Sequence, residues 1–579
     1  MLTAEPKAYG SNRHAATRVE SPSRPRLTVE SDVDVCVIGA GLAGLTVARE
    51  VARLGWSAVV LEAQSVAWSA SGRNAGVVLP GFAAGPDALI ERVGLDAARA
   101  LWARSVAGAE YVRSAARDMP GVELSETGWL HVSKTDDARA MAHEAAMLTG
   151  EFGVPVEPWP AERVRHALHS PRYFHGLHYP GGFSLHPLNY ALGLAAAAEA
   201  AGARIFEDTP VLEIDPAGVR KRIVTAHSRV RAAHVVLAGN VHLTELVPQF
   251  ASTLLPVYIA AIATAPLGGE LQEAIHYPGA VSDSGVAGHH HRIVGGRRLL
   301  WSGDSSVWLG KPKRHAEALL RQIRRTYPSL RDAKAEHAWI GTAGIPVHGM
   351  PQIGEISPGL WLLGGFGGHG LNTTAMGGEI VARAIVEGDT AWKMFSPFAL
   401  IWAGGAFGRA AQQLSGWSRR SRESVEAALA RRRDTRRVRA EAARVLTVVL
   451  AEASPTAAPD GPPEPIEQVV APTTPGLLEP AAASVAQPIV VAMEPASAAT
   501  VEEPTPEILE GQSGAAAPLI PDEQPAPIAK RRKRGPKRKQ AGGAQTLKDL
   551  SQQLIESDDA PTDSDEAEPS QPPSPDKKA

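Results

Sequence analysis

The stretch "DVCVIGAGLAGLTVAREVARLGWSAVVLEAQ", which begins at Asp34, constrains the fold more than any other part of the chain. Gly39, Gly41 and Gly44, spaced as G-x-G-x-x-G, follow a short apolar run and open a helix-like segment. The first glycine permits a tight turn from strand to helix, the second lets backbone approach a pyrophosphate, and the third lets the helix pack closely on the strand. The sequence therefore predicts a strand, a helix and a second strand that together bind a dinucleotide.

An acid at the end of the second apolar run narrows the choice of dinucleotide. Glu62 lies 18 residues (62 − 44) past the third glycine, where a carboxylate binds ribose hydroxyls. An acid at this position disfavours the 2′-phosphate of NADP. NAD and FAD both fit the motif, and a glycine-rich turn in another kind of α/β unit is the alternative to either.

Composition limits the kinds of partner and compartment. The 579 residues are enough for two to four domains, and 59 basic against 62 acidic side chains favour neither nucleic acid nor membrane as the main partner. The single cysteine, Cys36, excludes an internal disulfide framework and a cysteine-based zinc site, so we expect a cytoplasmic protein without a bound metal. No apolar run is long enough to cross a membrane. Residues 1–31 are polar, are interrupted by proline and lack the apolar region of a secretory signal, so we expect them to be disordered.

The C-terminal part of the chain has a different composition. No aromatic residue follows Trp417, and about half of the 46 prolines lie in residues 453–579. Such a segment cannot bury enough apolar surface to offset its chain entropy, so we predict that it is disordered. Its basic cluster, 530–539, is a solvated charge run or, alternatively, a weak site for an anionic partner. Residues 401–452 are rich in helix formers from Ser418 onward and are predicted to form a basic helical extension.

The segment after Glu62 carries a resemblance to a known family. It reads "AQSVAWSASGRNAGVV" and resembles the D-amino-acid-oxidase-type flavoproteins, most closely the branch of gamma-glutamylputrescine oxidases and glycine/sarcosine oxidases. In that family a small-residue loop S-G-R-N-x-G lies along the flavin, which implies FAD as the cofactor. The matching residues here are Ser71, Gly72, Arg73, Asn74, Ala75 and Gly76, and Ala63, directly after Glu62, is expected to contact the cofactor as well. Arg73 can neutralise pyrophosphate charge, and the small residues let backbone run close to the flavin ring.

Three later stretches resemble the same family in the same order, so that the resemblance spans about residues 32–395. "ETGWLHVS", from Glu126, resembles the strand that opens the substrate-side sheet. The second stretch is "GGFSLHPLNYALGLAAAAEAAGARIFEDTPV", from Gly181, and it resembles the segment that returns to the FAD-binding domain. It implies that Val211 presents backbone to the adenine and that Ala238 and Gly239, in the later "AAHVVLAGN", lie beside the cofactor. The third resembles a glycine loop that meets the flavin at the start of a helix, and its residues are Gly365, Phe366, Gly367, Gly368, His369, Gly370 and Leu371.

The resemblance and the alternation of apolar runs with helical stretches predict an α/β fold. A Rossmann-type FAD-binding domain would be interleaved with an α+β substrate domain within residues 32–400. The FAD-binding part is expected at about 32–90, 180–240 and 335–400, and the substrate part at about 91–179 and 241–334.

Departures from the family bear on the flavin and its electron acceptor. The lone Cys36 lies in the first strand and the early loop has no histidine, so we expect FAD to be bound non-covalently. Sarcosine-oxidase relatives use a lysine above the flavin to activate oxygen, but "GHHHRIVGGRRLLWSGDSS" has Arg297 and Arg298 and no lysine. The acceptor is therefore O2 or another electron carrier.

The resemblance implies oxidation of the C–N bond of a primary or secondary amine or an amino acid by hydride transfer to flavin N5, with O2 giving H2O2. Position and electrostatics supply most of the catalysis in such a reaction. The candidate catalytic residues are His348, Tyr258 and His369, with Trp301 as a further candidate for the substrate face. The alternatives are a D-amino-acid-type dehydrogenase that reduces a quinone or carrier, and a flavin-fold scaffold with an interaction tail.

A run of three histidines, 289–291, raises the question of a metal site. Adjacent residues on a strand point to opposite faces, so the three side chains cannot all converge on one ion. We therefore expect a turn or a partly exposed strand at this place.

Overall fold

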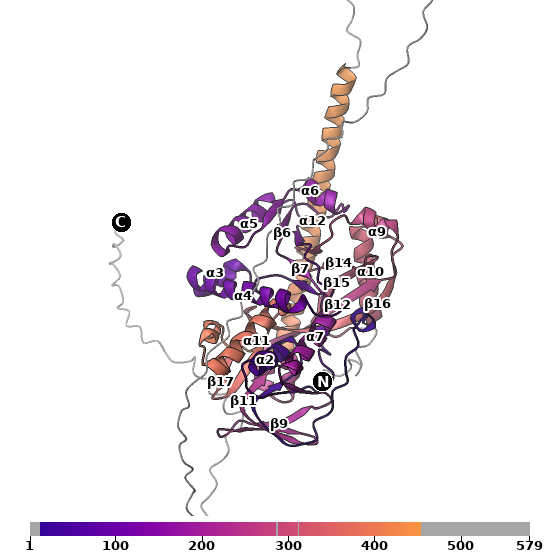
Figure 1. Ribbon diagram of the computed structural model, residues 1–579. Helices are drawn as coiled ribbons and strands as arrows, with labels where there is room; N and C mark the ends of the chain where they lie inside the picture. The colour runs from indigo at the N-terminus through magenta and orange to yellow at the C-terminus, as the bar shows by residue number, and fades with distance from the viewer. Residues whose placement is uncertain (1–11, 285–287, 311, 453–579) are drawn as a thin grey trace, which may run out of the picture. The chain divides into compact units, whose positions relative to one another are not determined.

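The computed structural model describes residues 12–284, 288–310 and 312–452 (Figure 1). The described residues up to Leu446 form the first of two compact units, and Thr447 begins the second. The elements described below belong to the first unit, apart from the end of its last helix. The tail predicted to be disordered, 453–579, and its basic cluster lie outside the described residues.

The first sheet has a parallel centre that is buried on both faces. Its order is β17-β18-β11-β1-β2-β8, and the hairpin β9-β10 extends from β11. Strands β18, β11, β1, β2 and β8 are parallel, and β17 pairs antiparallel at the edge. The bounds are β1 Ser31–Ile38, β2 Ala58–Leu61, β8 Arg204–Phe206, β9 Val211–Asp215, β10 Lys221–Thr225, β11 Arg229–Leu237, β17 Gln352–Ser357 and β18 Leu360–Gly364. The continuous apolar runs of β1 and β2 arise because helices or further strands cover both faces of a parallel sheet.

Four helices form one core with the first sheet. They are α2 Leu42–Arg53, α4 Leu95–Ala116, α7 Pro187–Ala200 and α11 Gly370–Glu387, and Figure 1 shows α2, α7 and α11 together beside the strands. Small residues let α11 approach its neighbours. A Cβ added to Gly108 of α4 would lie 2.3 Å from Asn372 O, and one added to Gly378 of α11 would lie 2.6 Å from Thr46 Cβ. The predicted strand, helix and second strand at Asp34–Glu62 are confirmed as β1, α2 and β2.

The second sheet is mostly antiparallel and has the order β16-β12-β15-β14-β13-β4-β6-β5. Its strands are β4 Trp129–Val132, β5 Glu157–Trp159, β6 Gly176–Tyr179, β12 Leu254–Thr264, β13 Ala280–Asp283, β14 His290–Val294, β15 Arg298–Ser306 and β16 Ala335–Pro346. The stretch "ETGWLHVS" supplies β4, as predicted. The sequence analysis assigned residues from 335 onward to the FAD-binding part. This assignment is wrong for β16, which pairs along its length with β12 in the second sheet. Helix α10, Pro312–Thr326, packs on one face through Leu319 and Ile323.

The remaining elements lie outside the two large sheets. They are α1 Arg13–Ala16, α3 Pro86–Val93, α5 Ala138–Phe152, α6 Ala161–Ala167, α8 Pro248–Ala251, α9 Gly269–Ala274 and α12 Gly405–Glu452, the 3₁₀ turns η1 Ala70–Gly72, η2 Asn240–Thr244, η3 Pro328–Leu330 and η4 Ala391–Phe395, and the two-stranded sheet of β3 Val77–Val78 and β7 Phe183–Ser184. Helix α12 is one long helix that starts before Ser418, and it is drawn in orange in Figure 1. No helix among the described residues is both long and apolar enough to cross a membrane.

The expectation of disorder before β1 is wrong for residues 12–31. Asn12 and His14 are buried around α1, and Leu27 is buried further along. Arg24 forms a two-fold hydrogen-bonded ion pair with Glu199 of α7, with both N···O distances 2.8 Å. The segment is ordered by these long-range polar contacts, which leave no hydrophobic periodicity in the sequence.

Candidate functional site

The glycine motif forms the turn between β1 and α2. Gly39 has φ +108°, in the region that favours glycine. Gly41 is the N-cap of α2 and offers no side chain at the positive end of the helix dipole. A Cβ added to Gly44 would lie 2.0 Å from Gly39 O. The turn thus leaves space in front of the helix N-terminus for an anionic group.

Glu62 lies at the end of β2, beside this turn. Its two carboxylate oxygens accept hydrogen bonds from Ala40 N (2.8 Å) and Gln64 N (2.9 Å). Burial raises the pKa of this carboxyl, whereas the two backbone N–H groups lower it. A carboxylate oxygen has more than one acceptor site, so Glu62 can also receive ribose hydroxyls. Ala63 follows Glu62 directly after the end of β2, and its role toward the cofactor stays a prediction.

The loop of residues 71–76, called the flavin loop below, contacts both the glycine turn and the second sheet. Ser71 Oγ accepts a hydrogen bond from Leu42 N (3.0 Å) in the first turn of α2. The Asn74 amide bonds Ala70 O and Ser71 O and accepts from Gly76 N. The guanidinium of Arg73 is buried and donates to Trp68 O (2.8 Å) and Ile340 O (3.3 Å). Arg73 therefore holds the loop to β16, and its role toward a pyrophosphate stays a prediction.

Two further predicted segments converge on the turn. Parallel pairing of β11 with β1 brings Ala238 and Gly239 against Gly39, whose added Cβ would lie 3.0 Å from Ala238 O. The glycine loop from Gly365 to Leu371 leads into α11, whose N-cap is His369. Gly365 and Gly367 have φ of +69° and +58°, and Gly368 and Gly370 complete the turn. Val211 begins β9 and pairs with Thr225, and no contact of the structure tests its expected role at an adenine.

A row of residues crosses the second sheet on the face toward the flavin loop. Strand register aligns His131, Ser282, His290, Ser302, Ala261 and Trp339, and paired residues point to the same face. Trp339 Nε1 donates to Arg73 O (2.9 Å), which identifies the face. The row therefore faces the part of the fold that carries the glycine motif.

Within this row, burial and then the neighbouring His131 and His369 lower the pKa of His290. Burial lowers the pKa of His290 and that of His369 to about 4, so both are neutral at pH 7. The Nδ1 atoms of both are buried without a hydrogen-bond partner among the described residues. Buried polar atoms in folded proteins are nearly always paired, so these two atoms are candidates for contact with a ligand.

The three consecutive histidines do not converge: His290 faces away from its neighbours, as strand alternation requires, while His289 and His291 both lie near Trp301. His289 Nδ1 bonds the buried carboxylate of Asp283 (3.1 Å), which also pairs with Lys134 Nζ at 2.7 Å. His291 lies on the opposite face from His290, stacked on Trp301 at 4.3 Å. The described residues contain no group of three or more potential metal ligands. The sequence analysis did not single out His290 as a site residue, although its position on the same face of β14 as Arg292 was a usable signal.

The other candidates for the substrate face lie elsewhere. Tyr258 and Trp301 belong to the core between the second sheet and α10, because they sit on the opposite side of their strands from Ala261 and Ser302. The prediction that they face the substrate is therefore wrong. His348 accepts from Met350 N (3.1 Å) and donates to Ala399 O (3.2 Å), so both ring nitrogens stabilise a turn and neither is available as a base.

The two arginines in place of the family's lysine lie at the end of the β14–β15 hairpin. Arg297 is exposed, and Arg298 bonds Thr264 O and the carboxylate of Glu336. Cys36 is buried in β1, and burial raises the pKa of its thiol to about 12, which makes it unsuited to covalent chemistry.

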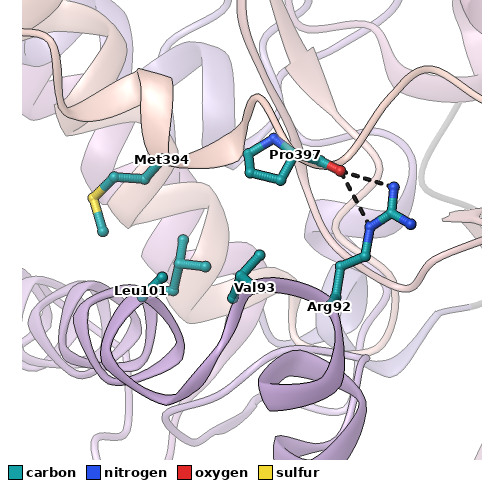
Figure 2. A pocket seen from close by; sticks show the side chains of 6 residues that line it. Arg92, Val93, Leu101, Met394 and Pro397 are labelled. Carbon is teal, nitrogen blue, oxygen red and sulfur yellow. Dashed lines mark hydrogen bonds between the residues drawn. The ribbon is translucent and has the colours of Figure 1, made fainter. Parts of the chain in front are cut away.

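A separate pocket opens between α3, α4 and η4 (Figure 2). Arg92 donates to Pro397 O (3.0 Å), and Val93, Leu101 and Met394 form an apolar wall. None of the glycine-motif or flavin-loop residues lines it, so it is distinct from the candidate site.

Acid is expected to destabilise the protein through buried neutral histidines. Burial lowers the pKa of His186 to about 4 and that of His291 to about 3, against about 6.5 in an unfolded chain. Below pH 6.5 these histidines bind protons in the unfolded state but stay neutral in the folded state. The free energy of unfolding therefore falls as pH falls. The loss is about 1.4 kcal/mol per pH unit for each such histidine down to its folded pKa.

Urea unfolding between pH 7.5 and 5 measures this effect. The variant His291→Phe, which cannot titrate at this position, is expected to show a shallower dependence on pH than the unaltered protein. Equal unfolding free energies of the unaltered protein at pH 7.5 and 5 would contradict the assignment.

The residues of the site fit FAD. The glycine turn has space for a pyrophosphate at the N-terminus of α2, Glu62 has acceptor sites for a ribose, and α11 begins at the glycine loop with its positive end toward the site. The unpartnered Nδ1 atoms of His290 and His369 add polar groups without a net charge. These groups are of the kinds that bind the pyrophosphate and ribose of a dinucleotide.

Comparison with known proteins supports the same assignment. The model of a family described as FAD dependent oxidoreductase (DAO) matches residues 34–384. A probable oxidoreductase OrdL of Haemophilus influenzae is 31% identical over 381 residues, which cover 64% of this chain and 87% of the relative. The gamma-glutamylputrescine oxidoreductase of Escherichia coli is 30% identical over 399 residues, which cover 68% and 92%.

Solved structures have the same fold. Glycine oxidase from Geobacillus kaustophilus superposes with a TM-score of 0.53 at 22% identity, covering 64% of this chain and 99% of that one. An L-proline dehydrogenase from P. horikoshii superposes with a TM-score of 0.53 at 18% identity, covering 63% and 96%. The glycine turn, the flavin loop and these matches give one conclusion: the chain belongs to the DAO family of FAD-dependent oxidoreductases.

Proposed function

We propose that the protein oxidises the C–N bond of an amine whose reacting carbon carries no carboxylate, such as a gamma-glutamylated polyamine. The observation that carries the proposal is the pair of buried, neutral and unpartnered imidazole nitrogens on His290 and His369. A neutral imidazole nitrogen without hydrogen accepts a hydrogen bond from an amine N–H. Bound FAD supplies the two-electron acceptor for the hydride on the neighbouring carbon.

The charges around the site favour a neutral amine. Neutral histidines, serines and apolar residues line the face, and such surroundings favour the uncharged form of an amine over the ammonium. Only the uncharged amine has the nitrogen lone pair that assists loss of hydride. His290 and His369 would thus hold the substrate nitrogen and orient its carbon, and the chain needs no strong base.

The cations near this face are engaged by protein groups. Arg292 Nε donates to Ala75 O (2.9 Å) and its Nη2 to Leu185 O (2.7 Å), while Lys134 pairs with Asp283. An α-amino acid would need a cation for its carboxylate next to the reacting carbon. The arrangement therefore supports an amine over an α-amino acid.

We further propose O2 as the acceptor. The balanced reaction is then R–CH2–NH–R′ + O2 + H2O → R–CHO + R′–NH2 + H2O2. A carrier-dependent dehydrogenase differs only in the second half-reaction, in which the reduced flavin passes its electrons to a carrier and not to O2. The amount of peroxide released per turnover therefore distinguishes the two.

The test is anaerobic reduction of the purified protein, followed by the loss of flavin absorbance, with gamma-glutamylputrescine, putrescine, sarcosine, glycine, D-alanine and proline. We expect a carboxylate-free amine group to reduce the flavin fastest. The variant His290→Phe should retain flavin but react about 10- to 100-fold more slowly, because it loses one acceptor and the positioning it provides.

The matched control is His143→Phe, at an exposed position of α5, which should react like the unaltered protein. Faster reduction by glycine or D-alanine, whose reacting carbon carries the carboxylate, than by every amine without a carboxylate at that carbon would overturn the substrate class. Full activity of His290→Phe would remove His290 from the site.

A further inference from the structure

The flavin loop is fixed through its backbone carbonyl groups. The carbonyl oxygens from Gly72 to Gly76 each accept a hydrogen bond from a residue far away in the sequence. The donors are Asn12 Nδ2 to Gly72 O (3.2 Å), Trp339 Nε1 to Arg73 O (2.9 Å), His14 Nε2 to Asn74 O (3.1 Å), Arg292 Nε to Ala75 O (2.9 Å) and Leu185 N to Gly76 O (2.8 Å). Three separate parts of the fold therefore determine the course of this loop.

Two of these donors come from the segment before β1. We call residues 12–27 the N-terminal strap. Asn12 and His14 are only 1% and 2% exposed, although they lie close to the start of the described chain. The hydrogen bond to a carbonyl requires a proton on His14 Nε2, and burial keeps the pKa of this histidine well below its usual value. Trp339 packs edge-to-face on the imidazole at 5.3 Å, so a second donor to the loop also touches the strap.

The strap is anchored along its length. His186 accepts from Asn189 N at Nδ1, so its Nε2 carries the proton and donates to Thr17 Oγ1 (3.0 Å). Arg24 pairs with Glu199, and Leu27 N donates to Thr209 Oγ1 (3.1 Å). These contacts hold the strap to α7 and to the start of β9 before the chain enters β1.

The loop has little freedom of its own once these donors are in place. Gly76 has φ +73°, and a Cβ added to it would lie 2.1 Å from Leu185 O. A buried carbonyl that loses its donor must find water or move, and either response shifts the neighbouring backbone. A shift in the flavin loop changes the surface that the loop presents to FAD.

We propose that the N-terminal strap is part of the FAD site, with Asn12 and His14 as positioning residues that hold the flavin loop in its FAD-binding conformation. The inference depends on FAD binding and does not depend on which amine is the substrate. Residues upstream of the glycine motif thus contribute to cofactor affinity without touching the motif itself.

The test compares His14→Ala, Asn12→Ala and the double variant with the unaltered protein. Equilibrium titration of apoprotein with FAD, followed by flavin fluorescence, gives the dissociation constant. We expect each single variant to bind FAD about tenfold more weakly and the double variant about 100-fold more weakly. His14→Gln, whose Nε2 amide can replace the imidazole donor, should recover most of the affinity, and the visible flavin spectrum should follow the same order.

Thermal unfolding of the apoproteins separates positioning from general stability. Positioning predicts weaker FAD binding in His14→Ala with an apoprotein melting temperature close to that of His14→Gln. His143→Ala on α5 is the matched control and should bind FAD normally. FAD affinity unchanged within twofold in the double variant would overturn the proposal. Equal loss of affinity in His14→Ala and His14→Gln would also overturn it, because the donor would then be irrelevant.

Discussion

Replacing Gly44 with valine is expected to give a protein that carries no FAD. A Cβ at this position would lie 2.0 Å from Gly39 O and 3.0 Å from Val37 Cγ1, and the two additional methyl groups of valine increase the overlap. Helix α2 would have to move away from β1, and the glycine turn would lose its shape. The flavin-to-protein absorbance ratio after gel filtration measures the outcome, and we expect a ratio near zero, with loss of soluble protein as the extreme case.

Gly150→Val is the matched control. Gly150 lies in α5, and an added Cβ there meets no atom within 4 Å. This variant should keep a normal flavin ratio, because its cost is confined to helix propensity. A normal flavin ratio in Gly44→Val would show that α2 and β1 need not be in close contact at this position.

The second large effect is expected from Asp283→Ala. The side chain of Asp283 is 2% exposed and pairs with Lys134 and His289. The ammonium group of Lys134 and the hydrogen bonds from both partners hold the pKa of the carboxyl well below its usual range despite burial. Removing the carboxylate leaves a largely buried ammonium group and His289 Nδ1 without a partner, which costs about 3–5 kcal/mol.

Urea unfolding measures the change in the free energy of unfolding. Asp332→Ala removes a carboxylate of the exposed Arg331–Asp332 pair and should leave stability unchanged, because exposed ion pairs contribute little. The double variant Asp283→Leu/Lys134→Met should recover part of the loss, because no unpaired charge remains. A loss in Asp283→Ala no larger than that in Asp332→Ala would contradict the role assigned to the buried pair.

The sequence was sufficient for the parts of the site that depend on local backbone geometry. The spacing of Gly39, Gly41 and Gly44 predicted a strand, a turn and a helix, and these elements form where they were expected. Glycine motifs are readable because each position has its own steric requirement. The small residues of the flavin loop are similarly recognisable by their order in the chain.

The sequence was insufficient to place side chains on the second sheet, because it does not show which face of each strand packs on α10 and which faces the flavin loop. Alternation predicted that the three histidines diverge, but it could not tell that His290 faces the flavin loop and His291 faces α10. The same ambiguity misplaced Tyr258 and Trp301, whose strands are apolar on both faces. The strap was missed for a different reason: Asn12, His14 and Arg24 are ordered by contacts with residues far away in the sequence, which leave no periodic pattern.

The strand order of the first sheet has a consequence for biosynthesis. Strand β1 lies between β2, which follows it closely, and β11, which begins near residue 229, while β18 completes the parallel row only near residue 364. A ribosome makes the apolar run of β1 long before its partners on that side exist. The nascent chain must therefore keep this side of β1 shielded while the chain up to β11 is added, which includes β4, β5 and β6 of the second sheet. Strand β18 and helix α11 can dock only after β12 to β16 have also been made. Long-range pairing of this kind slows folding and prolongs exposure of aggregation-prone surface, so we expect folding during synthesis to benefit from chaperones.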